Sequence, residues 1–564
     1  MPATVSAPAA LAAQSGAAWL AILQDTTGSL GSFGGDWALT ALAAAGVHPA
    51  DVRTSPTDPS AQDFYASLWT STGAGGQATD AERAILTAHA AGLDPARLDE
   101  HTNFVAQLAA QFDGHQLGGA GATNADIFGL LALRTVAQPQ IVLDTLATTI
   151  RAQQNADGGW NFAYPASSSD IDVTGAAVAA LCTAGATPGD PDVARALTFL
   201  RAKQDPASGG FASPFGINTD SAAWILSGLN ACAIDPATWS TAQGKTPVDF
   251  LLSQQNPDGS FQYNLGDGDE NLYATQDAVR ALAGAGFTAD PPARADGISP
   301  RTRPLPAVAP GTLVPLTLVI DSHGQLSGGS SVRMCAVTAP VGATVADFLQ
   351  MAHEASAPSY CVSDLDTQAG EIARLNGIAP VAGSSAWHVS VNGAAPQRTT
   401  SATVGLGSTV LLSLASDTTH APAPAPTTPA PAVIPSLIPA PARAPAPAPV
   451  RLALRTGVTS TLRDGRVTVR VVCPHSAGAA GCRGTVALCL WVRSSRHTRL
   501  RLHTVGRTRV QLTAGASTHV TITLDRAGRA LAKTRRAPVA TLVATLEDPL
   551  TRRLTSTRAS TVLR

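Results

Sequence analysis

Two carboxylates stand two residues apart in the stretch "SSSDIDVTGAAVAALCTAG", at Asp170 and Asp172. A carboxyl group that donates a proton needs a neighbour that holds it and tunes its acidity. Asp172 is therefore a candidate general acid, with Asp170 as the neighbour that tunes it. The same residues also fit a structural role, because they come directly before a run of small apolar residues that predicts a buried helix.

An aspartate recurs near the start of several predicted helices of this kind. Asp is a favoured N-cap residue, because its carboxylate accepts hydrogen bonds from the free N–H groups of the first helical turn. The recurring residues are Asp80, Asp126, Asp172 and Asp220. A residue that recurs in four repeats is more typical of a cap than of an active site, so we expect Asp172 to cap its helix.

Helical repeats occupy the first half of the chain. A Gly-x-aromatic turn followed by a small-residue helix occurs at Trp160, Phe211 and Phe261, at spacings of 51 and 50 residues, and again near Phe33. Two degenerate copies between Phe33 and Trp160 give about six repeats over residues 17–287. In each repeat an amphipathic helix precedes one that is apolar all round, which indicates an outer and an inner layer. The prediction is an all-α (α/α)6 toroid.

The repeat resembles that of terpenoid cyclases and protein prenyltransferases, and also that of the vitamin B12 carriers, transcobalamin and intrinsic factor. The resemblance rests on a Gln before each Gly-x-aromatic turn and on "ENLYATQDAVRAL" (Glu270–Leu282), which is similar to the last barrel repeat of the carriers. It covers roughly the first half of the chain. It implies either an enzyme or a binding protein.

The chain departs from these families at several points. Squalene-type cyclases carry a D-x-D-D motif whose middle Asp protonates the substrate, and here residues 170–173 read Asp-Ile-Asp-Val, without the last carboxylate. Cyclase cavities are lined by aromatic rings that stabilise carbocations, and aromatic residues make up only 5% of this chain. Prenyltransferases hold zinc with Asp, Cys and His, but no His lies between His115 and His323. We therefore expect no metal in the toroid and no cobalt-ligating His from its later repeats.

A Pro-rich linker at 288–311 precedes a predicted small α+β domain at 312–416. Its motifs follow in the order "TLVPLTLVIDS", "ATVADFL", "GEIARLNGI", "WHVSVNG" and "GLGSTV". The pattern predicts a strand, a helix capped by Thr344, a strand that ends in an Asn392-Gly393 turn, and a closing strand. The order resembles the small C-terminal domain of the transcobalamin family. Trp387 fits either a core position or a ligand contact.

The C-terminal region is basic. A Pro/Ala-rich spacer at 417–450 predicts an extended, semi-rigid connection. Residues 451–564 carry about 21 Arg and Lys against about 4 Asp and Glu, in a chain of net charge −2. Their alternation with β-forming residues predicts a β-sandwich. The arginines suit binding to an anionic cell-envelope polymer. The alternative is that they form a solvated face of the sandwich. We expect no nucleic-acid partner, because the arginines do not cluster with aromatic residues.

Cysteine usage indicates an exported protein. The seven cysteines form no C-x-x-C pair, which argues against zinc and favours disulfides. The predicted pairs are Cys335–Cys361, Cys473–Cys482 and Cys182–Cys232. Residues 1–16 fit either a disordered segment or an incomplete export signal. No apolar run is long enough to span a bilayer, so we predict a bacterial protein that is secreted or held at the cell surface.

Three functions fit these features. The main prediction is a non-enzymatic binding protein that holds a small-molecule ligand, cobalamin-like or another large polar molecule, between the toroid and the small domain, with no cofactor required. The alternatives are a terpenoid-cyclase-like enzyme that uses Asp172, and a cell-envelope adhesion or scaffold protein. The residues predicted to bind the ligand are Trp160, Tyr164, Asp172, Asp220, Tyr273 and Trp387.

Overall fold

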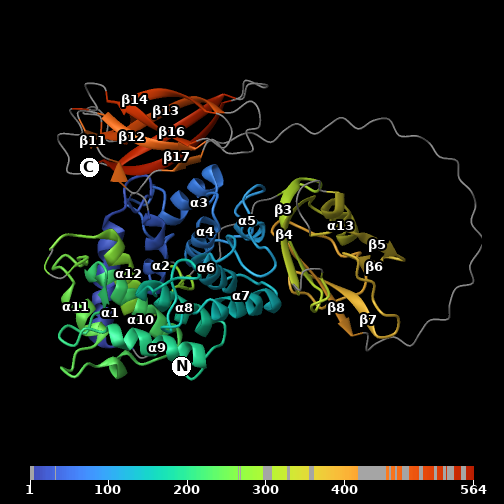
Figure 1. Ribbon diagram of the computed structural model, residues 1–564, viewed down its shortest axis with the longest axis horizontal. Coiled ribbons are helices and arrows are strands. Elements are labelled where there is room, and N and C mark those ends of the chain that lie inside the picture. The colour runs from blue at the N-terminus through green and yellow to red at the C-terminus, as the bar shows by residue number, and fades with distance from the viewer. Residues whose placement is uncertain are drawn as a thin grey trace, which may run out of the picture. The chain divides into compact units, whose positions relative to one another are not determined.

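The chain divides into two compact units, Met1–Pro426 and Thr427–Arg564. The structure, a computed structural model, describes residues 5–31, 34–264, 266, 268–295, 308–326, 331–354 and 361–416, and within 453–563 mainly the strands. Helices come first and strands follow (Figure 1). Across these ranges, no helix has both the length and the apolar character to cross a membrane.

Outer and inner helices alternate along the first half of the chain. The outer helices are α1 (Ala7–Ile22), α3 (Ala61–Thr72), α5 (Phe104–Ala109), α7 (Gln140–Ala152), α9 (Pro191–Lys203) and α11 (Pro247–Ser253). The inner helices are α2 (Ala38–Ala44), α4 (Ala78–Ala90), α6 (Thr123–Arg134), α8 (Ile171–Thr183), α10 (Thr219–Ala231) and α12 (Leu272–Leu282). Each inner helix contacts the next, and α12 contacts α2, so the inner layer closes into a ring (Figure 1). The predicted helical toroid is confirmed, but its first helix begins at Ala7, so the expectation of a disordered segment over residues 1–16 is wrong for residues 7–16.

A glutamine after the outer helix joins each of several repeats to the next. The side-chain Nε2 of Gln154 donates a hydrogen bond to the carbonyl of Gly158 in its own turn, at 2.7 Å, and another to the carbonyl of Asp192 in the following outer helix, at 2.8 Å. Equivalent pairs of bonds are made by Gln24, Gln204 and Gln255. The repeated Gln is therefore a structural residue that connects neighbouring repeats.

The same contact closes the ring between the last repeat and the first. Gln255 Nε2 donates to the carbonyl of Ala12, in α1, at 2.9 Å. Gly259, in the turn that follows, has a φ of +96°, and a Cβ added there would lie 2.5 Å from the carbonyl oxygen of Ser15. Glycine is required at this position by the left-handed backbone and by the close approach of α1.

Two of the predicted disulfides are present. Cys182–Cys232 joins the C-terminal ends of α8 and α10, with Cα atoms 5.0 Å apart, and Cys335–Cys361 lies within the small domain. The Cys473–Cys482 pair lies outside the residues whose side chains are described, so it stays a prediction.

The small domain has the predicted α+β elements. Its sheet has the order β4-β3-β8-β7, in which β3 and β8 run parallel. The strands are β3 (Leu313–Asp321), β4 (Val332–Pro340), β7 (Ser385–Val391) and β8 (Thr409–Ser416). Helix α13 (Val345–Glu354) contacts β4, and a two-stranded sheet holds β5 (Leu365–Gln368) and β6 (Glu371–Leu375). Thr344 accepts a hydrogen bond from the Asp347 N–H, as expected of a cap.

The second unit consists of two sheets. One has the order β10-β17-β16-β13-β14, and in the other β12 pairs with β9, β11 and β15. These strands are β9 (Ala453–Arg455), β10 (Thr459–Ser460), β11 (Leu462–Arg463), β12 (Arg466–Val472), β13 (Cys482–Arg493), β14 (Leu500–Leu512), β15 (Ser517–Thr523), β16 (Val539–Glu547) and β17 (Leu554–Leu563). The predicted strands are confirmed, whereas binding of an envelope polymer stays a prediction.

Replacement of Gly259 by Ala should weaken the closing contact. The new Cβ would overlap the Ser15 carbonyl and strain a left-handed backbone, so we expect the free energy of unfolding to fall by about 3 kcal/mol in urea titrations. Gly244→Ala is the matched control, because Gly244 also has a positive φ, of +75°, but open space around it. It should lose only about 1 kcal/mol, and equal losses would contradict the closing role.

Candidate active site

Asp170, and not Asp172, caps the helix that follows. Asp170 Oδ1 accepts hydrogen bonds from the backbone N–H groups of Asp172 and Val173, both at 2.9 Å. Helix α8 begins at Ile171, so Asp172 is its second residue and lies inside the first turn. The prediction that Asp172 is the cap is wrong, because the helix starts too early for Asp172 to reach the free N–H groups.

Asp172 and Asp220 occupy the second positions of the adjacent inner helices α8 and α10. The Oδ1 atom of each is buried and has no hydrogen-bond partner among the described residues. Burial raises the pKa of Asp172 to about 7, opposed by the Ser221 hydroxyl and assisted by the charges of Asp170 and Asp277. Burial also raises the pKa of Asp220 well above its usual value, assisted by the charges of Asp277 and Asp172. Burial therefore favours the protonated form of both carboxyls.

The charge that these two carboxyls face comes from Asp277, on α12. Its Oδ1 accepts a hydrogen bond from Arg280 Nη1 at 2.8 Å, and its Oδ2 accepts one from Trp224 Nε1 at 2.9 Å. Arg280 is 1% exposed, so the pair is a buried salt bridge. Breaking a buried salt bridge by removing one partner is strongly destabilising, so the contact with Arg280 holds Asp277 in place beside the two acids.

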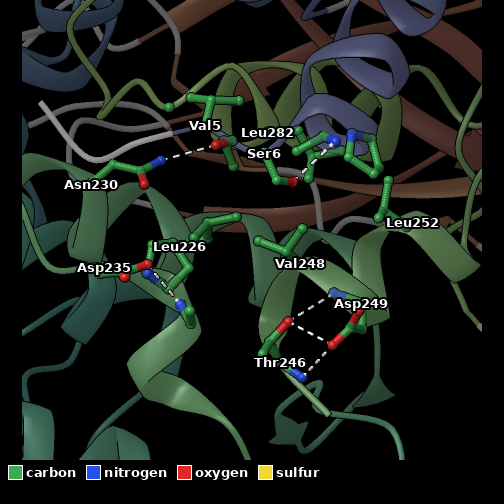
Figure 2. Close-up of a pocket in the computed structure, with 16 residues that line it drawn as sticks. Val5, Ser6, Leu226, Asn230, Asp235, Thr246, Val248, Asp249, Leu252 and Leu282 are labelled. Atoms are coloured by element: carbon green, nitrogen blue, oxygen red, sulfur yellow. Dashed lines mark hydrogen bonds between the residues drawn. The ribbon is translucent and has the colours of Figure 1, made fainter. Parts of the chain in front are cut away.

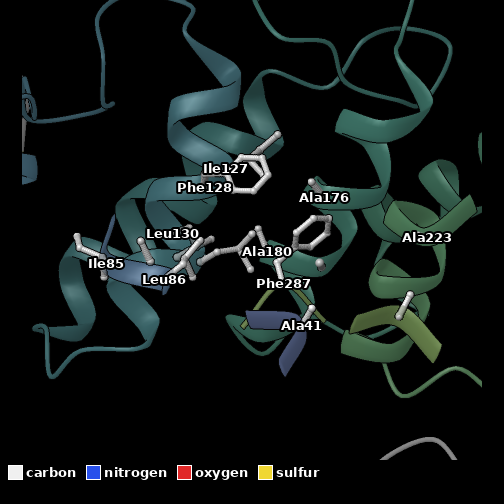
Figure 3. Packing of buried hydrophobic residues seen from close by; sticks show 14 of the residues in the cluster. Ala41, Ile85, Leu86, Ile127, Phe128, Leu130, Ala176, Ala180, Ala223 and Phe287 are labelled. Carbon is white, nitrogen blue, oxygen red and sulfur yellow. The ribbon is translucent and has the colours of Figure 1, made fainter. Parts of the chain in front are cut away.

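A cluster of aromatic rings lies next to this salt bridge. Phe287 packs edge-on against Trp224 and Phe128, with ring centroids 5.1 and 5.5 Å apart, and Trp37 contacts Phe128 at 6.2 Å. The Arg280 guanidinium lies 4.7 Å from the centroid of the Phe287 ring. Phe128 and Phe287 lie among small side chains of the inner helices (Figure 3). Aromatic faces attract positive charge, so this cluster suits a cationic group.

A second acidic pair lies on α4 and α6. Glu82 is fully buried, and neither of its carboxylate oxygens has a partner in the described part of the chain. Burial, together with the charges of Asp126 and Asp80, raises the pKa of Glu82 well above its usual value. Asp126 accepts hydrogen bonds from the Leu117 N–H and from Gln153 Nε2, and burial raises its pKa to about 7. Asp126 therefore orients a turn and is not an N-cap.

Among the residues predicted to bind a ligand, the structure brings Asp220 near Asp172 and near Tyr273. Trp160 is fully buried and donates its indole N–H to the Ile150 carbonyl at 2.7 Å. Trp387 is 2% exposed and belongs to the core of the small domain. Tyr164 and Tyr273 are partly exposed, each at 41%. Both tryptophan rings are core residues, and ligand binding by them stays a prediction.

Two cavities lie away from the acidic cluster. One of about 290 Å³ is lined by Arg97 and Gln138 of the toroid and by Thr409 of the small domain, and none of the predicted ligand residues lines it. Another, of about 310 Å³, is shown in Figure 2. There, Thr246 and Asp249 bond each other as a helix cap, so these groups are not free for chemistry.

Comparisons with known proteins find similarity to terpenoid cyclases. Residues 128–211 match the family model of the squalene-hopene cyclase N-terminal domain. The type II terpene cyclase MstE from Scytonema, without ligand, is 15% identical, with a TM-score of 0.34, and the match covers 49% of this chain and 98% of that one. The family match lies within the helical toroid, over residues 128–211.

Two further solved structures are variants of the same cyclase. One holds geranylgeranyl dihydroxybenzoate as substrate, at 15% identity and a TM-score of 0.33, and the other holds merosterolic acid A as product, at 16% and 0.32. Each match covers 49% of this chain and 96% of the other. No curated protein matches the chain. The resemblance of the small domain to the transcobalamin family stays a prediction.

Sequence reasoning missed Asp277, Arg280 and Trp224. The available signal was the pair of charged residues in "ATQDAVRAL", since a charge within an otherwise inner helix must find a buried partner. Among the described residues, no three His, Cys, Asp or Glu side chains are arranged to hold a metal ion.

The high pKa of Asp172 should make stability depend on pH. The folded state retains this proton up to about pH 7, whereas an ordinary Asp loses it near 3.8, so stability falls as pH rises between these values. The asparagine of Asp172→Asn cannot ionise. This variant should therefore lose less of its free energy of unfolding between pH 4 and 8 than the wild type does, by at most about 4 kcal/mol, as measured by urea unfolding. Asp144→Asn, at an exposed site on α7, should run parallel to the wild type. Parallel curves for Asp172→Asn as well would show that the carboxyl is not protonated on folding.

Proposed function

We propose that the toroid is an acid catalyst of the terpenoid-cyclase type, in which Asp172 donates a proton to a carbon–carbon double bond of an isoprenoid chain. The observation that carries this proposal is the Asp172 carboxyl, with a buried, unpartnered Oδ1 and a pKa of about 7. A general acid works best when its pKa lies near the operating pH. The family match over residues 128–211, which include Asp172, supports the same function.

The chemistry would need no cofactor. The proton of Asp172 forms a C–H bond with one alkene carbon and leaves a carbocation on the other. The π electrons of a second double bond attack this cation and close a ring. The final cation loses a proton to water, and the Asp172 carboxylate takes a proton from solvent. The product is an isomer of the substrate, so atoms and charge balance.

The neighbouring carboxylates take the place of the one missing from the D-x-D-D motif. Val173 stands at the last position of that motif, but Asp277 and Asp220 reach the same region from α12 and α10. The negative charge of Asp277 favours the protonated form of Asp172 before the reaction. We assign Asp277 as a positioning residue, because it acts through Asp172 while Arg280 and Trp224 hold its two oxygens.

The rings beside the salt bridge would stabilise the cation. Trp224 links the two parts of the site, because its indole N–H bonds Asp277 while its ring contacts Phe128 and Phe287. A cation over an aromatic face is stabilised by roughly 0.5–2 kcal/mol per ring. A site with an acid at one end and aromatic faces beyond it suits a hydrocarbon chain with separated double bonds.

Incubation with squalene and with geranylgeranyl compounds tests the proposal. We expect a cyclised isomer of at least one substrate by gas chromatography and mass spectrometry, and a loss of at least about 10²-fold in rate for Asp172→Asn. Asp277→Asn should lower the rate at pH 7 and shift the pH profile, while Asp144→Asn should leave both unchanged. Folding of each variant is checked by circular dichroism. If no isomer forms from any of these substrates, or if Asp172→Asn turns over at the wild-type rate, the toroid is not this enzyme.

A further inference from the structure

The segment that follows the last inner helix turns back into the toroid. Gly284, just past the end of α12, has a φ of +79°, which reverses the chain. Asn230 Nδ2, on α10, donates a hydrogen bond to the carbonyl of Ala285 at 3.0 Å and fixes the start of the segment. Residues 284–295 are here called the strap. From the sequence, we expected this segment to be only the end of the last repeat and the beginning of a linker.

Phe287, in the strap, occupies the interior of the ring of inner helices. It is 1% exposed and packs against Phe128 of α6 and Trp224 of α10. Figure 3 places its ring beside Ala180 of α8 and Ala41 of α2. A side chain from beyond the last inner helix therefore fills the space that an apolar molecule would need to reach the aromatic cluster.

The rest of the strap is held by the buried side chain of Ala289, which packs with Ala43 and Ala90, and by a few polar contacts. His89 Nε2 and Asp290 Oδ1 lie 2.9 Å apart, and the Asp290 side chain is 95% exposed. Arg294 Nε donates to Asp51 Oδ1 at 3.1 Å, and the Ala295 N–H donates to Asp51 Oδ2 at 2.8 Å. Within the described residues, 286–294 make no backbone-to-backbone hydrogen bond. A segment held in this way opens locally more easily than a helix does.

We propose that the strap is a releasable plug, in which Phe287 holds the place of an apolar ligand and blocks the acidic site until the strap leaves. The identity of the ligand rests on the proposed function, but the plug itself rests only on the contacts of the strap. Burial of equal apolar area by a ligand and by the Phe287 ring gives comparable stabilisation, so one can replace the other. The contact of His89 with Asp290 and the partly buried ion pair of Arg294 with Asp51 are the polar contacts that release would break, together with the packing of Phe287 and Ala289.

The plug predicts that ligand binding and strap opening occur together. The Asp172→Asn protein, which should not turn over, is mixed with geranylgeraniol, and hydrogen exchange is followed by mass spectrometry. We expect exchange at residues 285–290 to accelerate while exchange in α12 does not.

Asp290→Ala with Arg294→Ala, in the same background, should bind geranylgeraniol roughly three- to tenfold more tightly. Asp364→Ala with Arg374→Ala removes another exposed ion pair, in the small domain, and should leave the affinity unchanged.

A second variant tests the position of the plug directly. Phe287→Ala leaves a space the size of a benzyl group, so toluene should bind this variant and not the wild type, as measured by ligand-observed NMR. The plug is refuted if toluene does not bind Phe287→Ala, or if geranylgeraniol leaves exchange of the strap unchanged. If the strap opens but the wild type forms no cyclised product, the proposed function is refuted and the plug is supported. If the product forms while the strap stays closed, the plug is refuted and the proposed function is supported.

Discussion

The toroid depends on one repeated interaction, a glutamine amide that spans the boundary between two repeats. Each of these amides donates one hydrogen bond to its own glycine turn and one to a backbone carbonyl of the next repeat, as Gln154 does to Gly158 and Asp192. Both acceptors are backbone carbonyls, so the interaction fixes the backbones relative to each other and leaves the side chains of the inner helices free to vary. The small residues of those helices then pack into a closed ring, which brings the first turns of α8 and α10 side by side.

The acidic cluster is a consequence of that closure. Two opposing effects act on a carboxyl in the first turn of a helix. The helix dipole favours the ionised form by roughly 0.3–1 kcal/mol, which is less than one pKa unit. Burial and nearby carboxylates act the other way, and the pKa of about 7 for Asp172 shows that they dominate. Arg280 offsets part of the charge through its salt bridge to Asp277.

Features that depend on a local sequence pattern could be predicted from the sequence alone. The repeat spacing predicted the toroid, and the strands, the Thr344 cap and the Cys182–Cys232 and Cys335–Cys361 disulfides followed from composition and position. The roles of Asp170 and Asp172 could not be predicted, because they depend on whether α8 begins at Ile171 or two residues later. Asp277 lies about a hundred residues from Asp172 along the chain, so only the closed ring reveals that the two interact.

The Gln255–Ala12 hydrogen bond also has a consequence for how the chain acquires its fold. It joins residues 243 positions apart, so the ring cannot close until the last repeat has left the ribosome. Until then the inner helices of an unfinished toroid expose their small apolar side chains along an open edge. Long-range closure of this kind slows folding, and transiently exposed apolar surface promotes aggregation. The unfinished arc is therefore the state in which this chain is most exposed to aggregation, and that exposure ends only when the last repeat meets the first.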